Sequence, residues 1–173
     1  MKIRSDLYLN NHSQLLTFVQ GPQDTKDRVL LRLAAALFYG GYPLITDPSI
    51  QHPALWGQEY VPDFFVTNDT NDITLWIQCG KTTINKLEKI SKRFHHARFV
   101  MLLGLPHEGQ QMADTVSSSS VRQLEIWSFQ KGEFERWRHL VTEKNDIIGE
   151  SSESNLNLVI NNDLFVTDLI RFH

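Results

Sequence analysis

The stretch VPDFFVTNDTNDITLWIQCG, residues 61–80, decides the fold class of this chain. Two apolar segments, Val61–Thr67 and Ile73–Cys79, flank a turn rich in Asn and Asp, which is typical of two antiparallel strands. Such strands can hold polar side chains on one face of a sheet. Asp63 and Gln78 supply one oxygen-bearing side chain each, as a metal-dependent phosphodiesterase requires. The stretch therefore predicts a strand pair with two candidate oxygen donors.

The remaining chain alternates between helix and strand patterns, without a repeat or a linker. The predicted elements are a hairpin over Ser5–Gln20, helices from Asp24 or Thr25 to Tyr39 and over Thr82–His95, a strand over Arg98–Leu103, a short helix over His107–Val116, a strand over Arg122–Phe129, a helix or turn over Lys131–Leu140 and a closing hairpin over Leu156–Ile170. Tyr42–Trp56 is predicted to be irregular, and Asn145–Glu153 is a polar segment to which no strand is assigned. Together they predict one α/β domain over residues 1–173, a mixed central sheet flanked by helices with added N- and C-terminal hairpins.

Composition narrows the class of protein. The 173 residues carry a net charge of −3, which argues against binding nucleic acid through the whole surface but allows a local cationic groove. Cys79 is the single cysteine, so no internal disulfide can form. The sequence shows neither a signal-peptide pattern nor an apolar run of membrane-spanning length. We expect a soluble cytoplasmic protein, a monomer without a membrane partner.

A basic cluster follows the strand pair. Six cationic residues stand against the single acid Glu88, a local charge of +5: Lys81, Lys86, Lys89, Lys92, Arg93 and Arg98. Charge runs of this kind are often a solvated helix face. They also suit a surface that faces phosphates. The residues alone leave both interpretations open.

With these residues in view, the chain resembles the YaeQ family, small bacterial proteins with a PD-(D/E)XK nuclease-like fold. The resemblance covers most of the chain. It rests on the ordered set Asp24-Thr25-Lys26-Asp27-Arg28 before Leu30–Leu33, Pro62-Asp63, Trp76–Gly80, the basic helix with Lys86 and Lys89, Leu124–Trp127 and the closing hairpin. It implies a PD-(D/E)XK restriction-endonuclease-like core.

The resemblance also implies a site. Asp63 would be the motif's aspartate, and Gln78 stands where the second acid belongs. Gly80 stands where the motif lysine belongs, so that Lys86 or Lys89 would replace it. The site would hold Mg²⁺, or Mn²⁺ as a substitute, on Asp63 and Gln78.

Two acids could restore the charge that Gln78 lacks. Asp27 would reach the metal from outside the sheet, and Glu59 precedes Asp63 by four residues. An acid in the first turn of a helix, such as Asp27, is also explained by the helix dipole alone. Two functions follow: a Mg²⁺-dependent nuclease or phosphodiesterase, or a non-catalytic module that binds nucleic acid or a protein partner through the helix over residues 82–95.

Overall fold

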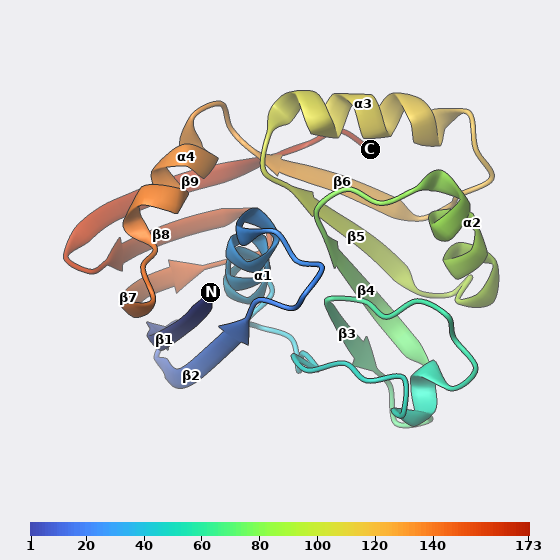
Figure 1. Ribbon diagram of the computed structural model, residues 1–173, viewed down its shortest axis with the longest axis horizontal. Coiled ribbons are helices and arrows are strands. Elements are labelled where there is room, and N and C mark those ends of the chain that lie inside the picture. The colour runs from blue at the N-terminus through green and yellow to red at the C-terminus, as the bar shows by residue number, and fades with distance from the viewer. The chain divides into compact units, whose positions relative to one another are not determined.

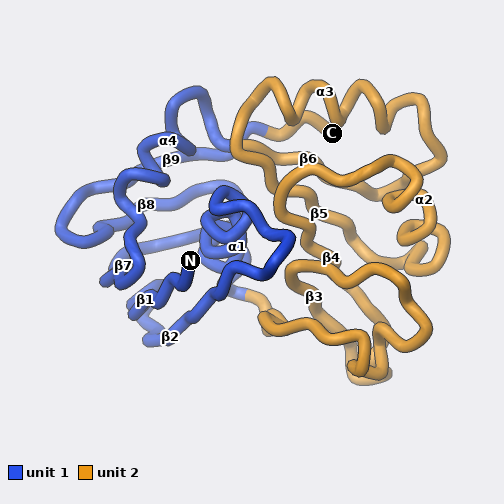
Figure 2. Tube along the Cα trace, viewed as in Figure 1, with its two compact units in different colours: residues 1–41, 129–170 blue, residues 42–128, 171–173 orange.

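The computed structural model describes residues 1–173 and contains nine strands, four α-helices and one short 3₁₀-helix, Pro53–Leu55 (Figure 1). The chain divides into two compact units (Figure 2). Unit 1 comprises residues 1–41 and 129–170, and unit 2 comprises residues 42–128 and 171–173. The mixed arrangement confirms the predicted α/β class, whereas the assignment of all 173 residues to one domain stays a prediction.

Five strands form the sheet of unit 1, in the order β2-β1-β7-β8-β9. Their bounds are β1 Lys2–Leu9, β2 His12–Val19, β7 Lys144–Ser151, β8 Asn155–Ile160 and β9 Asp163–Arg171. β1 and β7 run parallel, and the other neighbours run antiparallel. Two-residue turns close the hairpins β1–β2 and β8–β9, and all four turn residues, Asn10, Asn11, Asn161 and Asn162, have positive φ. Asparagine tolerates this conformation, which two-residue hairpin turns require, so both predicted hairpins are confirmed.

Strand β7 corrects the sequence analysis, which assigned no strand to Asn145–Glu153. This strand lies at the centre of unit 1, between β1 and β8. Its sequence carries polar residues at exposed positions, such as Asp146 and Glu150, and a glycine at position 149. Ile147 and Ile148 are its only large apolar residues. The strands that pair with it supply most of the buried side chains around it, so its own sequence gives a weak strand signal.

Two helices pack on the inner face of this sheet: α1, Lys26–Phe38, and α4, Glu133–Leu140. Thr25 caps α1 by accepting a hydrogen bond from the backbone N–H of Arg28, as Ser and Thr do at helix starts. The buried Trp137 of α4 donates its indole N–H to the Leu30 carbonyl oxygen at 3.0 Å. Its ring lies 5.4 Å from that of Phe165 on β9, so one aromatic side chain joins both helices to the sheet.

The outer face of the same sheet carries a row of exposed apolar side chains. Tyr8, Ile148, Val159 and Leu164 stand opposite one another on β1, β7, β8 and β9. Each is between 42% and 63% exposed. Hydrophobic residues scattered singly over a surface are common, but four in cross-strand register are not. Apolar residues therefore lie on both faces of the sheet of unit 1.

Unit 2 has four strands, in the order β6-β5-β4-β3. They are β3 Phe64–Thr67, β4 Ile73–Cys79, β5 Arg98–Leu103 and β6 Leu124–Phe129, the last residue of which belongs to unit 1. β3 and β4 are antiparallel, as predicted, and β4, β5 and β6 are parallel. Helices α2, Ile84–Arg93, and α3, Pro106–Ser117, bury Leu87, Ile90 and Ala113 against Trp76 and Met101 of the sheet. No helix combines the length and the apolar character of a membrane-spanning segment.

Gly149 provides a test of this description of β7. Its φ is 150°, and a Cβ atom there would lie 2.1 Å from the backbone oxygen of Asn157 on β8. Gly149→Ala must push two paired strands apart, so we expect a loss of about 3 kcal/mol in the free energy of unfolding. Urea denaturation measures this loss. Gly41→Ala is the matched control, since a Cβ there meets no atom within 4 Å, and equal stability of the two variants would contradict the strand pairing.

Candidate functional site

The structure brings Asp63 and Gln78 together at one end of unit 2. Asp63 lies directly before β3, and its backbone N–H donates to the Ile77 carbonyl oxygen at 2.9 Å. Its side-chain Oδ2 accepts the backbone N–H of Cys79 at 2.7 Å and the Gln78 amide Nε2 at 3.1 Å. Both side chains are buried, at 4% and 3% exposure. The carboxylate therefore extends the β3–β4 pairing beyond the last residue of the ladder.

This donor set does not fit a Mg²⁺ ion as it is arranged. A magnesium site needs oxygen atoms directed at one point, with room for several water molecules. Here Gln78 presents its amide N–H to Asp63, while its Oε1 is buried without a hydrogen-bond partner. No group of three or more His, Cys, Asp or Glu side chains is placed to hold a metal. Asp63 and Gln78 form a strand-joining hydrogen bond in this arrangement.

Helix α2 directs one row of basic side chains at the irregular segment Trp56–Tyr60. Arg93 donates to the carbonyl oxygens of Trp56 and Gly57, the latter at 2.7 Å. One turn earlier, the ammonium of Lys89 lies 3.5 Å from a Glu59 carboxylate oxygen and 5.8 Å from the Tyr60 ring centroid. The helix thus contacts the backbone of the segment at Trp56 and Gly57 and its side chains at Glu59 and Tyr60.

Three residues with predicted site roles, Lys86, Lys89 and Glu59, lie within this contact. The Lys86 ammonium stands 5.1 Å from the Tyr60 ring centroid, a cation–π distance. Glu59, which was expected to supply negative charge near Asp63, instead raises the pKa of Lys89 through its carboxylate charge. Lys86 and Lys89 therefore share one aromatic neighbour, and Glu59 is an ion-pair partner of the helix.

Within this contact, Trp56 is unusually exposed to solvent for a tryptophan. Its backbone is held by Arg93, yet its indole side chain is 78% exposed, more than any other large hydrophobic residue of the chain. Tryptophan is highly buried on average, because its ring has the largest apolar area. An exposed indole on a segment whose backbone is held in place offers a flat aromatic ring to a ligand. The sequence offered no signal for it beyond its place in a proline-rich segment.

Ion pairs with acids from other parts of the chain compensate part of the local charge of +5. Lys81 pairs with Glu108 of α3 at 3.2 Å. Arg98 forms a bidentate pair with Glu125 of β6, at 2.6 and 2.9 Å. Acids from distant segments thus compensate charges that the sequence left unmatched, and the remaining cationic surface is confined to α2.

Asp27, the fifth predicted site residue, lies in unit 1. It occupies the first turn of α1, and its carboxylate pairs with the guanidinium of Arg138 on α4. The pair joins the two helices of unit 1, and the helix dipole favours an acid at this position. A role for Asp27 at a metal stays a prediction.

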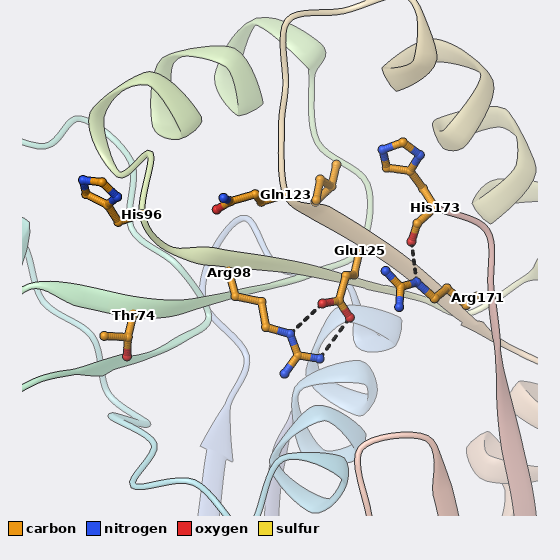
Figure 3. Close-up of a pocket in the computed structure, with 8 residues that line it drawn as sticks. Thr74, His96, Arg98, Gln123, Glu125, Arg171 and His173 are labelled. Carbon is orange, nitrogen blue, oxygen red and sulfur yellow. Dashed lines mark hydrogen bonds and ion pairs between the residues drawn. The ribbon is translucent and has the colours of Figure 1, made fainter.

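A hollow at the opposite end of β4 was not foreseen from the sequence. It is an open hollow of about 570 Å³ at the amino-terminal ends of β4, β5 and β6, and we call it the Arg171 pocket (Figure 3). Its polar lining residues are Thr74, His96, Arg98, Gln123, Glu125, Arg171 and His173. They come from four separate places in the chain, so no sequence motif marks them.

Comparison with known proteins gives the family. A family model described as YaeQ protein matches residues 5–164. The crystal structure of a YaeQ protein from Xanthomonas axonopodis pv. citri has a TM-score of 0.69 at 17% identity and covers 98% of this chain and 96% of that protein. One from Pseudomonas syringae has a TM-score of 0.73 at 15% identity, with coverages of 99% and 95%.

At these identities the two crystal structures show a shared fold and nothing about activity. No curated protein matches the sequence. The family match spans nearly the whole chain and agrees with the resemblance carried by Pro62-Asp63 and the Trp76–Gly80 segment. The protein belongs to the YaeQ family.

Proposed function

We propose that this YaeQ-family protein is a non-catalytic module that binds single-stranded nucleic acid through α2 and the Trp56–Tyr60 segment. The observation that carries the proposal is the exposed indole of Trp56, fixed through its backbone by Arg93 beside a cationic helix. Proteins that bind single strands combine a positively charged track for the backbone with aromatic rings on which bases stack. Both components are present within one surface.

The charge of this surface supports a polyanion as the ligand. Its basic side chains are Lys86, Lys89, Lys92 and Arg93, and its acids are Glu59 and Glu88, so it keeps a net charge of +2 in a chain of net charge −3. The contacts of Arg93 are with neutral groups, the carbonyl oxygens of Trp56 and Gly57 and the Gln58 amide, so its charge stays uncompensated. Protein–protein interfaces are enriched in tryptophan, tyrosine and arginine but depleted in lysine, so the three lysines of this surface favour a polyanion over a protein partner.

The phosphodiesterase alternative needs a different arrangement of Asp63 and Gln78. A metal-bound form requires the Gln78 carbonyl oxygen, and not its N–H, to face the carboxylate. It also requires water to enter a site where both side chains are nearly fully buried. The hydrogen bond between them supports a structural role for both residues.

Gln78→Glu tests the choice between the two functions. The variant places a second carboxylate beside buried Asp63, so we expect a loss of about 3–5 kcal/mol in the free energy of unfolding. If no metal site exists, millimolar Mg²⁺ or Mn²⁺ should recover none of the lost free energy of unfolding. Thermal unfolding with and without the cations measures both effects, with exposed Gln14→Glu as the control. Stabilisation of the wild type by Mg²⁺ that Asp63→Ala abolishes would establish the metal site instead.

Trp56→Ala tests the stacking role. Loss of one base–aromatic stack costs about 1–3 kcal/mol of binding free energy, which corresponds to a loss of affinity of about 5- to 150-fold. Fluorescence anisotropy of a labelled oligothymidylate titrated with the protein measures the affinity. The melting temperature should not fall, because the indole is exposed. Unchanged affinity would remove this surface from consideration as a nucleic-acid site, and exposed Tyr8→Ala in unit 1 is the aromatic control.

Lys92→Gln tests the electrostatic component. Lys92 is exposed in the last turn of α2. If it contacts one phosphate, the slope of log affinity against log salt concentration should decrease in magnitude by about 0.7, the value for single strands. The same anisotropy titration at several salt concentrations gives this slope. Lys131→Gln, an exposed lysine of unit 1, should leave it unchanged, and an equal effect of both variants would indicate non-specific attraction.

A further inference from the structure

Strand β2 forms one edge of the sheet of unit 1 and leaves a row of backbone groups unpaired (Figure 1). The backbone N–H and C=O groups of successive residues point to opposite sides of a strand. Just after β2, the Gln20 N–H donates to the Met1 carbonyl oxygen at 2.9 Å, so the even-numbered residues face β1. The residues that direct their N–H and C=O groups away from the sheet, where these groups meet no hydrogen-bond partner, are Ser13, Leu15, Thr17 and Val19.

None of the usual features that protect a free edge is present in β2. Native proteins shorten edge strands, place lysine or proline on them, bend them with bulges or cover them with other segments. β2 has eight residues, contains no Lys, Arg, Asp, Glu or Pro, and pairs with β1 in an unbroken register. Its outward-facing Leu15 and Val19 are 52% and 58% exposed. The strand is therefore long, neutral, regular and open to solvent.

The edge strand of unit 2 has the protection that β2 lacks. β3 is only four residues long, and its pairing with β4 carries a register shift between Val66 and Thr67. On its outer side, a backbone bridge joins Ile45 to Phe65 and covers part of the edge. Each of these features discourages pairing with another chain. The protein thus protects one edge and leaves the other available, which favours β2 as a site of strand pairing.

We propose that β2 pairs antiparallel with β2 of a second copy of this chain, about a two-fold axis at Thr17. The neutral sequence of β2 argues for a second copy, because a two-fold axis brings residues of like charge together and opposed like charges destabilise a sheet. Thr17 itself directs its backbone groups at the free edge, so at the axis the two copies exchange both of their hydrogen bonds. The two sheets then continue into each other.

Side-chain matching selects Thr17 as the axis. On the outer face of the sheet, Leu15 then lies opposite Val19 of the partner subunit, and on the inner face Leu16 lies opposite the partner subunit's Phe18. Apolar pairs and Thr–Thr pairs across strands both stabilise a sheet. An axis at Leu16 would instead place Leu15 opposite the partner's Thr17, which mixes apolar and polar side chains. This interface lies in unit 1 and is independent of the nucleic-acid surface on α2.

Sedimentation velocity of the full chain over a range of concentrations tests the proposal. The wild type should form a dimer, in place of the monomer expected from the sequence. Thr17→Lys places two ammonium groups beside the axis and should raise the dissociation constant of the dimer by at least about 10-fold. The fold should persist in circular dichroism, because Thr17 is exposed and edge strands accept lysine. Asn157→Lys, the same charge change at an exposed position of β8, is the matched control and should leave the dimer intact.

Cysteine cross-linking tests the register. A short bifunctional maleimide should join two copies of the Thr17→Cys variant, because residues opposed in a hydrogen-bonded antiparallel pair have Cα atoms about 5.5 Å apart. Leu15→Cys is the control, since its copy lies about 13 Å further along the paired strand. The native Cys79 is buried and should not react. A monomer at millimolar concentration, a dimer that Thr17→Lys leaves unchanged, or preferential cross-linking of Leu15→Cys would each overturn the proposal.

Discussion

The buried carboxylate of Asp63 is the constraint on which unit 2 depends. The segment before it, residues 42–62, has little regular structure, and the strand after it is only four residues long. By accepting N–H groups from Cys79 and Gln78, Asp63 fixes the point at which the irregular segment joins the sheet. Arg93 fixes the same segment further back, at Trp56. These two polar contacts, with the backbone bridge from Ile45 to Phe65, hold a segment that has little secondary structure of its own.

Charged and polar residues of this chain therefore have to be judged by their partners. The residue types that a nuclease uses for chemistry, an acid, an amide and a lysine beside a sheet, form structural contacts here: Asp63 with Gln78, and Lys89 with Glu59. A polar side chain that is already satisfied within the protein has little left to offer a ligand. The Gln78 Oε1 atom is the exception at this contact, because it is buried without a hydrogen-bond partner, and the exposed indole of Trp56 lies elsewhere.

Sequence patterns within a single element predicted most of the fold. Contacts between distant segments of the chain left no such pattern and were missed. Alternating apolar residues around Asn10-Asn11 and Asn161-Asn162 identified both hairpins, because turn chemistry and strand pattern are both local. β7 was missed, since its neighbours β1 and β8 come from distant parts of the chain and its own residues are largely polar. The pairing of Arg98 with Glu125 and the assembly of the Arg171 pocket depend on strand order, which no spacing in the sequence reveals.

The apolar row on the outer face of unit 1 has a consequence for how the strands find their alignment. A slip of one residue usually exchanges buried apolar side chains for polar ones, and this penalty fixes the register. In β7 a slip would exchange Ile147 for Ile148, so its own apolar residues set a small penalty, whereas in β8 a slip would bury Asn157 in place of Leu158. The two-residue turn at Asn161-Asn162 and the close approach of Gly149 to β8 add backbone constraints on the alignment of β7. The register of β7 is therefore set by its neighbours and by backbone geometry more than by its own hydrophobic pattern.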